Sequence, residues 1–376
     1  MRVLHVYRMY FPDPPGGLQE AVRQLALATR PHGVESRIFT LSPTPSPPRL
    51  EVPEGEVVRQ KSWAAPASCD LGGPGAFREF AAQVRWADVV HYQFPWPFAD
   101  LLHFARRPDK PCVLTYQSDV VRKGWLGRLY IPLMRRMLAS MDAVVATSPA
   151  YLETSPYLQS LVAPERRHVI PLGICEPSYQ EAVEGARAIE VCQRFGLSGP
   201  GYFLFLGALR GYKGLDVLAD AVRGTDIPVV IAGDGALASE VRALTAASPN
   251  VKWLGHVSDA EKMALLEACR SLVLPSSMRS EAFGMVQVEA QMCARPVIST
   301  ELGTGTTYVN EAGVTGLVVP PNDADALRDA MHALLADPER AATMGRAGRA
   351  RYETMFSGQA LGRSYADLYR RLLADA

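Results

Sequence analysis

The sequence has no excess of charge of either sign and no long apolar run. Lysine plus arginine equals aspartate plus glutamate, at 39 each, so no overall basic field would hold nucleic acid and we expect no such partner. No segment approaches the roughly 20 apolar residues that a membrane-spanning helix needs. The opening residues are too interrupted for a signal peptide. We therefore expect a cytoplasmic protein.

Cysteine is sparse, and its placement excludes a disulfide or zinc framework. The six cysteines show no spacing typical of metal ligands; they stand at positions 69, 112, 175, 192, 269 and 293. Several lie in apolar runs, so we interpret them as small buried hydrophobic side chains. At 376 residues, the chain is long enough for two domains of ordinary size.

Short β-rich runs alternate with helical patterns along the whole chain, which predicts the α/β class with helices on both faces of parallel sheets. The proline-rich stretch 44–53 cannot join the centre of a sheet. We expect strands over 2–7, 35–41, 57–60, 88–92, 112–116, 143–147 and 168–171, and then over 202–207, 228–232, 251–254, 271–274, 296–299 and 316–319.

The pattern of strands and helices in each half of the chain therefore predicts a separate doubly wound, Rossmann-like sheet. We expect an N-terminal domain over 1–171, a linker over 172–200, a C-terminal domain over 201–355 and a final amphipathic helix over 356–376. Ligands of open α/β sheets bind beyond the carboxyl ends of the strands. Two such sheets facing a central cleft would share one ligand site, and its residues should follow strands.

A glycine-bearing loop follows the first expected strand of each half. Gly16 and Gly17 would let the backbone approach a ligand closely, although a plain turn looks the same. In the second half, Gly207, Arg210 and Lys213 stand between a strand and a helix. Two cations three positions apart on a flexible loop favour a diphosphate clamp over a solvated basic turn.

A further pair of glycines, Gly233 and Gly235, follows the strand expected at 228–232. Their backbone freedom would shape a pocket for the nucleotide base. A tight strand-to-helix turn would produce the same pattern.

Two carboxylates eight positions apart, Glu281 and Glu289, flank a Phe-Gly step after the strand expected at 271–274. A helix over 283–293 would place Glu281 at its mouth and Glu289 about two turns inside. Free N–H groups at the helix start suit a phosphate, and the carboxylates suit hydroxyls. The alternative is an ordinary strand-turn-helix with a solvated Glu281 and a salt-bridged Glu289.

Together these motifs resemble family 4 of the retaining glycosyltransferases, whose GT-B fold has two facing Rossmann-like domains and a last helix that crosses back to the first domain. The resemblance covers essentially the whole chain. Its carriers are Gly16-Gly17, Arg210 with Lys213, Gly233-Asp234-Gly235, the pair Glu281 and Glu289, and Glu301-Leu-Gly-Thr-Gly with Asn310 and Gly316.

The resemblance implies roles for single residues. Arg210 and Lys213 would hold the diphosphate of a nucleotide-sugar donor, Glu281 would bind the transferred sugar and Glu289 the ribose hydroxyls. Backbone amides would come from Phe283, Gly284 and Met285. In the family's front-side substitution, the leaving phosphate helps to deprotonate the acceptor. Because the cations and a helix N-terminus can neutralise that phosphate, we expect no metal and no cofactor.

The sequence departs from this pattern at Gln117 and Gln93, where related chains commonly have histidine. Glutamine can hydrogen-bond a hydroxyl but cannot accept its proton near neutral pH. An inactive relative that binds nucleotide sugar is therefore one alternative. We favour an active enzyme, because front-side transfer does not rest on one protein base, and we keep Gln117 among the catalytic candidates.

Residues 121–137 combine five cations with apolar side chains. Such a mixture suits an anionic lipid surface, here the inner face of the membrane, or else a core helix with a basic outer face.

Our reading is a hexosyltransferase that moves mannose or rhamnose, from a GDP-linked donor by preference, to a glycan or lipid-linked glycan acceptor. The stretches that begin at His91 and Thr115 look most like mannosyl and rhamnosyl transferases of O-antigen assembly. A sugar-nucleotide epimerase of the same fold is the enzyme alternative.

Overall fold

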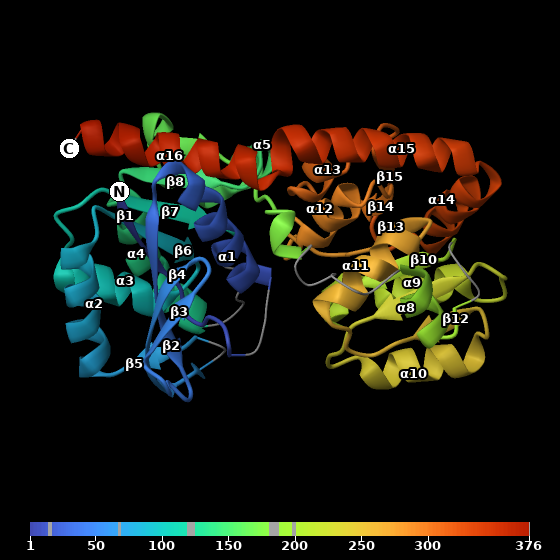
Figure 1. Cartoon of the computed structure of the whole chain (residues 1–376), viewed down its shortest axis with the longest axis horizontal. Coiled ribbons are helices and arrows are strands. Elements are labelled where there is room, and N and C mark those ends of the chain that lie inside the picture. Colours follow the sequence, from blue (N-terminus) through green and yellow to red (C-terminus); the bar gives the residue numbers. More distant parts are fainter. Residues whose placement is uncertain (14–16, 67–68, 119–124, 180–187, 198–200, 376) are drawn as a thin grey trace. The chain divides into compact units, whose positions relative to one another are not determined.

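The computed structural model describes residues 1–13, 17–66, 69–118, 125–179, 188–197 and 201–375. It contains two compact units (Figure 1). Unit 1 consists of Met1–Gly173 together with Gly358–Ala376, and unit 2 of Ile174–Ser357. Each unit is built on a sheet of its own.

The sheet of unit 1 has the order β3-β4-β2-β1-β6-β7-β8-β9. Its strands are β1 (Arg2–Val6), β2 (Glu35–Ser42), β3 (Arg49–Val52), β4 (Gly55–Ala64), β5 (Leu71–Gly72), β6 (Val89–Phe94), β7 (Cys112–Tyr116), β8 (Ala143–Ala146) and β9 (Arg167–Val169). All pairs are parallel except those that β3 and β5 make with β4. The sequence pattern missed β3 and β5. β3 lies inside the proline-rich stretch but at the edge of the sheet, where proline is tolerated.

The sheet of unit 2 is parallel throughout and has the order β12-β11-β10-β13-β14-β15. Its strands are β10 (Phe203–Leu206), β11 (Val229–Ala232), β12 (Val251–Trp253), β13 (Ser271–Leu274), β14 (Val297–Thr300) and β15 (Gly316–Val319). This is the doubly wound order, in which the direction of winding reverses between β10 and β13. In unit 1 the same reversal falls between β1 and β6. Ligands of such sheets bind at this switch point.

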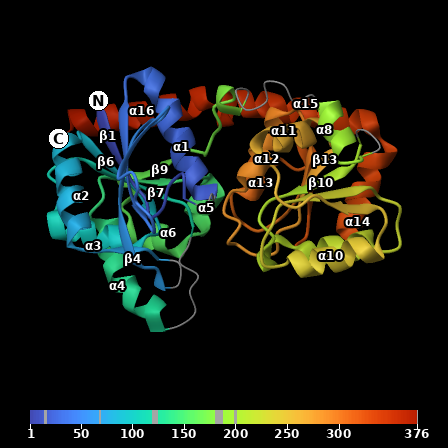
Figure 2. The same cartoon turned by 60° about the horizontal axis from the view of Figure 1, so that its bottom comes forward.

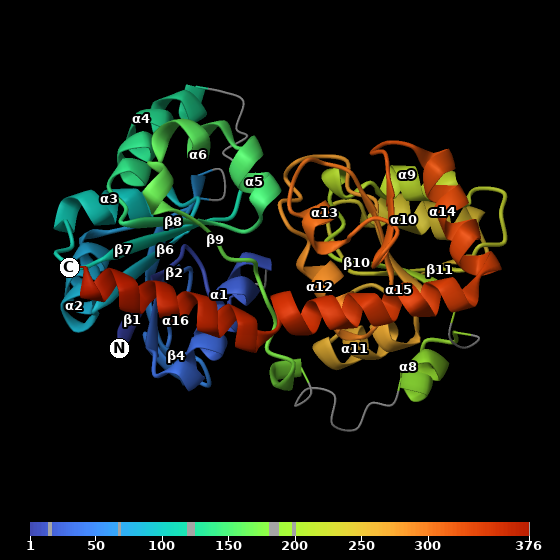
Figure 3. The same ribbon diagram turned by 90° about the horizontal axis from the view of Figure 1, so that it is seen from above.

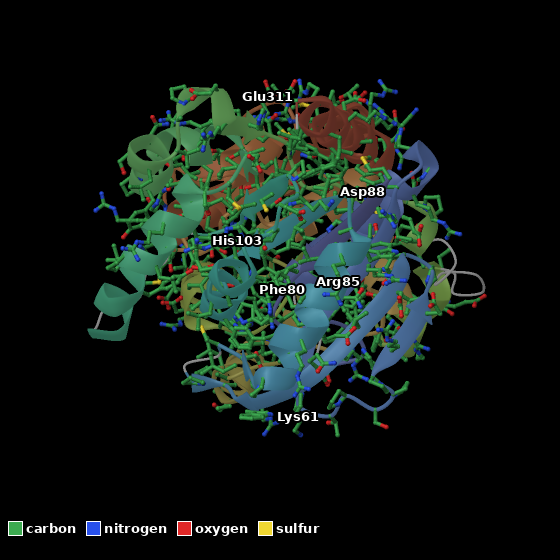
Figure 4. All side chains as sticks on the ribbon, turned by 90° about the vertical axis from the view of Figure 1, so that its left-hand side faces the viewer. Lys61, Phe80, Arg85, Asp88, His103 and Glu311 are labelled. Atoms are coloured by element: carbon green, nitrogen blue, oxygen red, sulfur yellow. The ribbon has the colours of Figure 1, made fainter. Side chains whose placement is uncertain are left out.

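Helices cover both faces of the unit 1 sheet. They are α1 (Gly17–Thr29), α2 (Pro74–Trp86), α3 (Pro97–Arg106), α4 (Trp125–Ala139), α5 (Pro149–Thr154), α6 (Pro156–Leu161) and α16 (Gly358–Ala374). Figure 3 shows α1 and α16 on one side of the sheet and α3 and α4 on the other. Phe80 of α2 and His103 of α3 are labelled in Figure 4. Their rings pack against that of Tyr92, with centroids 6.5 and 5.4 Å away.

Helices also cover both faces of the unit 2 sheet. They are α8 (Ala188–Arg194), α9 (Leu215–Val222), α10 (Ala238–Ala247), α11 (Asp259–Ala268), α12 (Met285–Met292), α13 (Thr306–Val309), α14 (Ala324–Ala336) and α15 (Pro338–Arg351). Figure 2 shows α10 and α14 along one face and α11 and α12 along the other. Among the helices that the structure describes, none is both long and apolar enough to span a bilayer.

The C-terminal helix α16 is part of unit 1. It packs on α1 so closely that a Cβ atom added to Gly362 would lie 1.9 Å from the carbonyl oxygen of Ala28. Arg370 donates to the carbonyl of His32 at 3.0 Å. The buried side of the helix includes Tyr365 and Tyr369. The last residues of the chain therefore complete the interior of a domain that begins with the first ones.

Candidate active site

Two loops flank the switch point of unit 2, one after β10 and one after β13. The backbone N–H of Ser277 donates to the carbonyl of Tyr212 at 2.8 Å. Gly214 has a left-handed backbone, with φ of 70°, and an added Cβ would lie 1.9 Å from the carbonyl oxygen of Pro275. Only glycine permits both this conformation and this approach. The two loops thus touch through their backbones.

The side chains of Lys213 and Glu281 form an ion pair between these loops. Their side chains are 12% and 9% exposed. The hydroxyl of Ser276 donates to the same carboxylate at 3.0 Å, and the hydroxyl of Thr304 donates to the Glu281 carbonyl at 2.8 Å. The Glu281 carboxylate is therefore buried and engaged by an ion pair and a hydrogen bond. The alternative prediction of a solvated Glu281 is wrong. Ser276 was not among the expected site residues, and Thr304 was noted only as part of the motif 301–305.

Arg210 differs from Lys213 although both lie on the loop after β10. Its side chain is exposed, at the N-cap of the short 3-10 helix Gly211–Lys213. No residue in the described ranges forms an ion pair with it. The structure thus offers one cation engaged with a carboxylate and one facing solvent. Their joint action on a diphosphate stays a prediction.

The helix after β13 begins later than the sequence pattern indicated. α12 starts at Met285, and the preceding Gly284 is left-handed with φ of 76°. Phe283 thus lies outside the helix, and Glu289 is about one turn inside it. At the start of α12 the N–H of Gln287 donates to the Gly284 carbonyl at 2.9 Å, whereas those of Met285 and Val286 have no acceptor among the described residues. These two N–H groups can still receive an anion.

Two residues outside the sequence motifs bind the Glu289 carboxylate. Lys262 of α11 contacts its carboxylate at 2.9 Å, and the hydroxyl of Tyr179 donates to the same oxygen at 3.0 Å. Burial alone would lower the pKa of Lys262, but the charges of Glu289 and Asp259 raise it above its ordinary value. The salt-bridged alternative for Glu289 therefore describes this structure. A ribose contact stays a prediction.

The glycines after β10 and β11 lie against each other. An added Cβ on Gly233 would lie 1.9 Å from the carbonyl oxygen of Gly207, and one on Gly235 would lie 2.6 Å from that of Leu209. The N–H of Leu209 donates to the carbonyl of Asp234 at 3.0 Å. Close backbone packing by itself accounts for these glycines. Contact with a nucleotide base stays a prediction.

Gln117 lies in unit 1, directly after β7. It is buried, and its Nε2 donates to Oε1 of Gln93 at 2.8 Å. The two glutamines, which stand where the resemblance predicts histidine, are thus neighbours in space. Gly17 is the first residue of α1, whereas Gly16 lies outside the described residues.

Two carboxylates at Asp-x-Asp spacing, Asp323 and Asp325, have local structural roles. Asp323 caps α14 by accepting from the N–H of Ala326 at 2.9 Å. Asp325 pairs with Arg328 one turn later at 2.6 Å.

The segment expected to dock on lipid is described in part. Residues 119–124 and the side chains up to position 129 lie outside the described residues. In the remainder of α4, Met134, Met137 and Leu138 are buried while Arg135 and Arg136 are exposed. This end is a core helix with a basic outer face.

The strand order and the polar groups at the carboxyl edge of the sheet define a ligand-binding α/β protein of the Rossmann type. Residues 193–351 match the family of group 1 glycosyl transferases, and residues 16–173 match the glycosyl transferase 4-like domain. The chain therefore belongs to the group 1 (family 4) glycosyltransferases, the family that its motifs indicated, and is an enzyme of the transferase class.

Several relatives match nearly the whole chain, and two of them are at least 38% identical to it. It is 43% identical over 362 residues to the D-rhamnosyltransferase WbpZ of Pseudomonas aeruginosa, covering 95% of this chain and 92% of the relative. It is 38% identical over 375 residues to O-antigen chain mannosyltransferase C of Escherichia coli, covering 99% of each. Among solved structures, sucrose-phosphate synthase from Thermosynechococcus elongatus shares the fold, with a TM-score of 0.79, 23% identity and full coverage of both chains.

Proposed function

We propose that this glycosyltransferase moves mannose or D-rhamnose from a GDP-linked donor to the glycan of an O-antigen-like polysaccharide. Support comes from the two relatives, a rhamnosyltransferase and an O-antigen mannosyltransferase. The observation that carries the proposal is the pair of Lys213 and Glu281 at the switch point of unit 2. It sets a cation suited to phosphate beside a carboxylate suited to sugar hydroxyls.

In the proposed complex, the donor diphosphate lies between the loop after β10 and the start of α12. Arg210 is exposed and can approach it as a planar fork, and Lys213 supplies a point charge. The N–H groups of Met285 and Val286, at the start of α12, add donors. When Lys213 turns to the phosphate, the Glu281 carboxylate becomes available to accept from sugar hydroxyls.

The proposed chemistry is front-side substitution with retention. The bond between the anomeric carbon and the phosphate oxygen breaks, and its electron pair stays on the phosphate. The acceptor oxygen bonds to the anomeric carbon on the same face, and its proton passes to the departing phosphate. Gln117 can hydrogen-bond a hydroxyl but cannot take that proton, which fits the phosphate as the base. The proposed reaction requires no metal.

The test is nucleotide release from GDP-mannose, GDP-D-rhamnose, UDP-glucose and UDP-N-acetylglucosamine, with and without a polysaccharide or lipid-linked acceptor. We expect release only with a GDP-sugar and an acceptor. An isomerised nucleotide sugar formed without acceptor would identify an epimerase. Binding without transfer, together with higher turnover in Gln117→His, would identify a binding relative. Absence of both release and thermal shift with every donor would refute the proposal.

We also propose that residues 121–137 contact anionic lipid. The support is the sequence itself, with three cations in the part before Tyr130. The full-length protein should sediment with phosphatidylglycerol vesicles but not with phosphatidylcholine vesicles. A variant with Arg122, Lys123 and Arg128 changed to glutamine should stay in the supernatant, and equal sedimentation of both proteins would contradict the proposal.

A further inference from the structure

A row of polar side chains runs through the interior of unit 1. Residues two apart on a strand point to the same face, which places His91 with Gln93 on one side of the sheet. Thr115 of β7 and Gln117, the residue after β7, lie on that side as well, because they hydrogen-bond to His91 and Gln93. All four are buried. Strands covered on both faces are normally almost continuous in valine, isoleucine and leucine, so this polar row needs a partner inside the fold.

Two tyrosines of α16 supply that partner. Tyr365 and Tyr369 stand one helical turn apart and are both fully buried. The hydroxyl of Tyr369 lies 2.7 Å from Nδ1 of His91, and that of Tyr365 lies 2.8 Å from Oγ1 of Thr115. Oγ1 of Thr115 in turn lies 2.7 Å from Nε2 of His91. Each polar atom of this group therefore has a partner.

The row continues from His91 to the carboxyl edge of the sheet. Nε2 of Gln93 lies 3.4 Å from Nε2 of His91, and Oε1 of Gln93 accepts from Nε2 of Gln117 at 2.8 Å. Gln117 follows the last residue of β7, at the edge where ligands of such sheets bind. An unbroken series of hydrogen bonds thus joins the C-terminal helix to that edge.

The state of His91 sets the direction of this series. Burial, with the neighbouring His5, holds the pKa of His91 well below its ordinary value, so the ring is neutral with one N–H. When Nδ1 carries the hydrogen and donates to Tyr369, Nε2 is an acceptor, and both the Thr115 hydroxyl at 2.7 Å and Nε2–H of Gln93 at 3.4 Å face it as donors. The side-chain oxygen of Gln93 then faces Gln117 and accepts a hydrogen bond from the Gln117 amide N–H. The side-chain oxygen of Gln117 stays available to accept a hydrogen bond from a ligand. The opposite tautomer would turn both amides round.

We propose that Tyr365 and Tyr369 are positioning residues for sugar transfer. Through Thr115, His91 and Gln93 they hold the carbonyl oxygen of Gln117 ready to accept a hydrogen bond from a sugar hydroxyl. This inference rests on the proposed function, because it gives Gln117 a role at the sugar. It makes the C-terminal helix part of the transfer machinery and assigns its two hydroxyls a task beyond packing.

The first test compares Tyr369→Phe with Tyr202→Phe in the full-length protein. Tyr202 is a matched control, because its buried hydroxyl donates to the Leu265 carbonyl at 2.8 Å in unit 2. We expect similar losses of thermal stability in both variants. Only Tyr369→Phe should lower kcat, by about tenfold, which is the effect of one lost hydrogen bond, with the donor KM within about twofold. Equal kcat in both variants would overturn the proposal.

The second test asks whether Tyr369 acts through Gln117. In a double-mutant cycle, Tyr369→Phe should cost nothing further in a Gln117→Ala background, because the residue that it positions is gone. A purely structural role predicts that the tenfold loss persists there, and that result would also overturn the proposal. Tyr365→Phe should behave in the same way.

A third measurement separates this proposal from the proposed function. If the wild type transfers no sugar, the imidazole nitrogen chemical shifts of His91 still report its tautomer. We expect the hydrogen on Nδ1 in the wild type and its loss from that position in Tyr369→Phe. An unchanged tautomer would show that Tyr369 does not orient the row, whatever the activity of the protein.

Discussion

Replacing Lys213 by methionine tests whether the ion pair at the switch point serves the donor or only the fold. Methionine keeps most of the apolar stem and removes the ammonium group. Glu281, with its side chain 9% exposed, would keep the Ser276 hydroxyl but lose its counter-charge. Removing one partner of a buried pair costs about 3–5 kcal/mol. Because this pair retains some exposure, we expect the free energy of unfolding of unit 2 to fall by about 2–3 kcal/mol.

The effect on the donor should be larger than this loss of stability can explain. A charge that contacts phosphate in a nearly closed site contributes about 2–4 kcal/mol to binding. Since 1.4 kcal/mol is a factor of ten, Lys213→Met should weaken GDP-sugar affinity by roughly 30- to 1000-fold. The double variant Lys213→Met/Glu281→Gln removes the unpaired charge as well. It should regain most of the stability and none of the affinity.

The assays are urea denaturation for stability and titration calorimetry for donor binding. Lys252→Met serves as control, because Lys252 is an exposed lysine of β12 whose ammonium group donates to the carbonyl of Gly196 at 3.1 Å. It should change neither quantity measurably. Donor affinity that recovers in the double variant would refute the reasoning, since Lys213 would then act on the fold alone.

Three further outcomes follow from close packing and burial. Gly233→Ala places a Cβ 1.9 Å from the Gly207 carbonyl oxygen, so the free energy of unfolding measured with urea should fall by about 3 kcal/mol or more. Gly211 has open space around it, so Gly211→Ala should lower the same quantity by less than about 1 kcal/mol. Equal losses in the two variants would contradict the role of close packing. Burial raises the pKa of Asp100 to about 8, so the folded state keeps a proton that the unfolded chain releases near pH 4. Wild-type stability should fall from pH 4 to 8 relative to Asp100→Asn, by up to about 1.4 kcal/mol per pH unit, and a constant difference would refute the assignment. Burial lowers the pKa of His103 to about 4, so between pH 6.5 and 4 the unfolded chain binds a proton that the folded protein does not. The free energy of unfolding of the wild type, measured relative to His103→Gln, should therefore fall as the pH falls from 6.5 to 4, and equal pH slopes in the two proteins would contradict this assignment.

Much of the fold could be predicted because its pattern is local. The buried runs of β10 and β11 are continuous and apolar, as is typical of strands covered on both faces. The sequence did not predict β3 and β5, which are edge pieces of few residues without such a pattern. It placed the start of α12 too early, because the apolar spacing continues through a glycine whose backbone is left-handed.

The candidate site divides in the same way. The sequence by itself identified Lys213, Glu281 and Glu289, because residue types and spacing after strands are visible in a linear pattern. It could not show that Lys213 engages Glu281 across 68 positions, or that Lys262 holds Glu289.

Sequence and structure differ most in what they say of Gln117. From the sequence, this position shows only a glutamine where related chains commonly have histidine. Only the tertiary structure decided that this amide ends a buried row anchored by Tyr369, itself 278 positions from His91. Local sequence fixes which element forms and which face it buries. Partners so distant meet only when the sheet is assembled and the C-terminal helix closes over it, because each contact depends on the packing of every element between them.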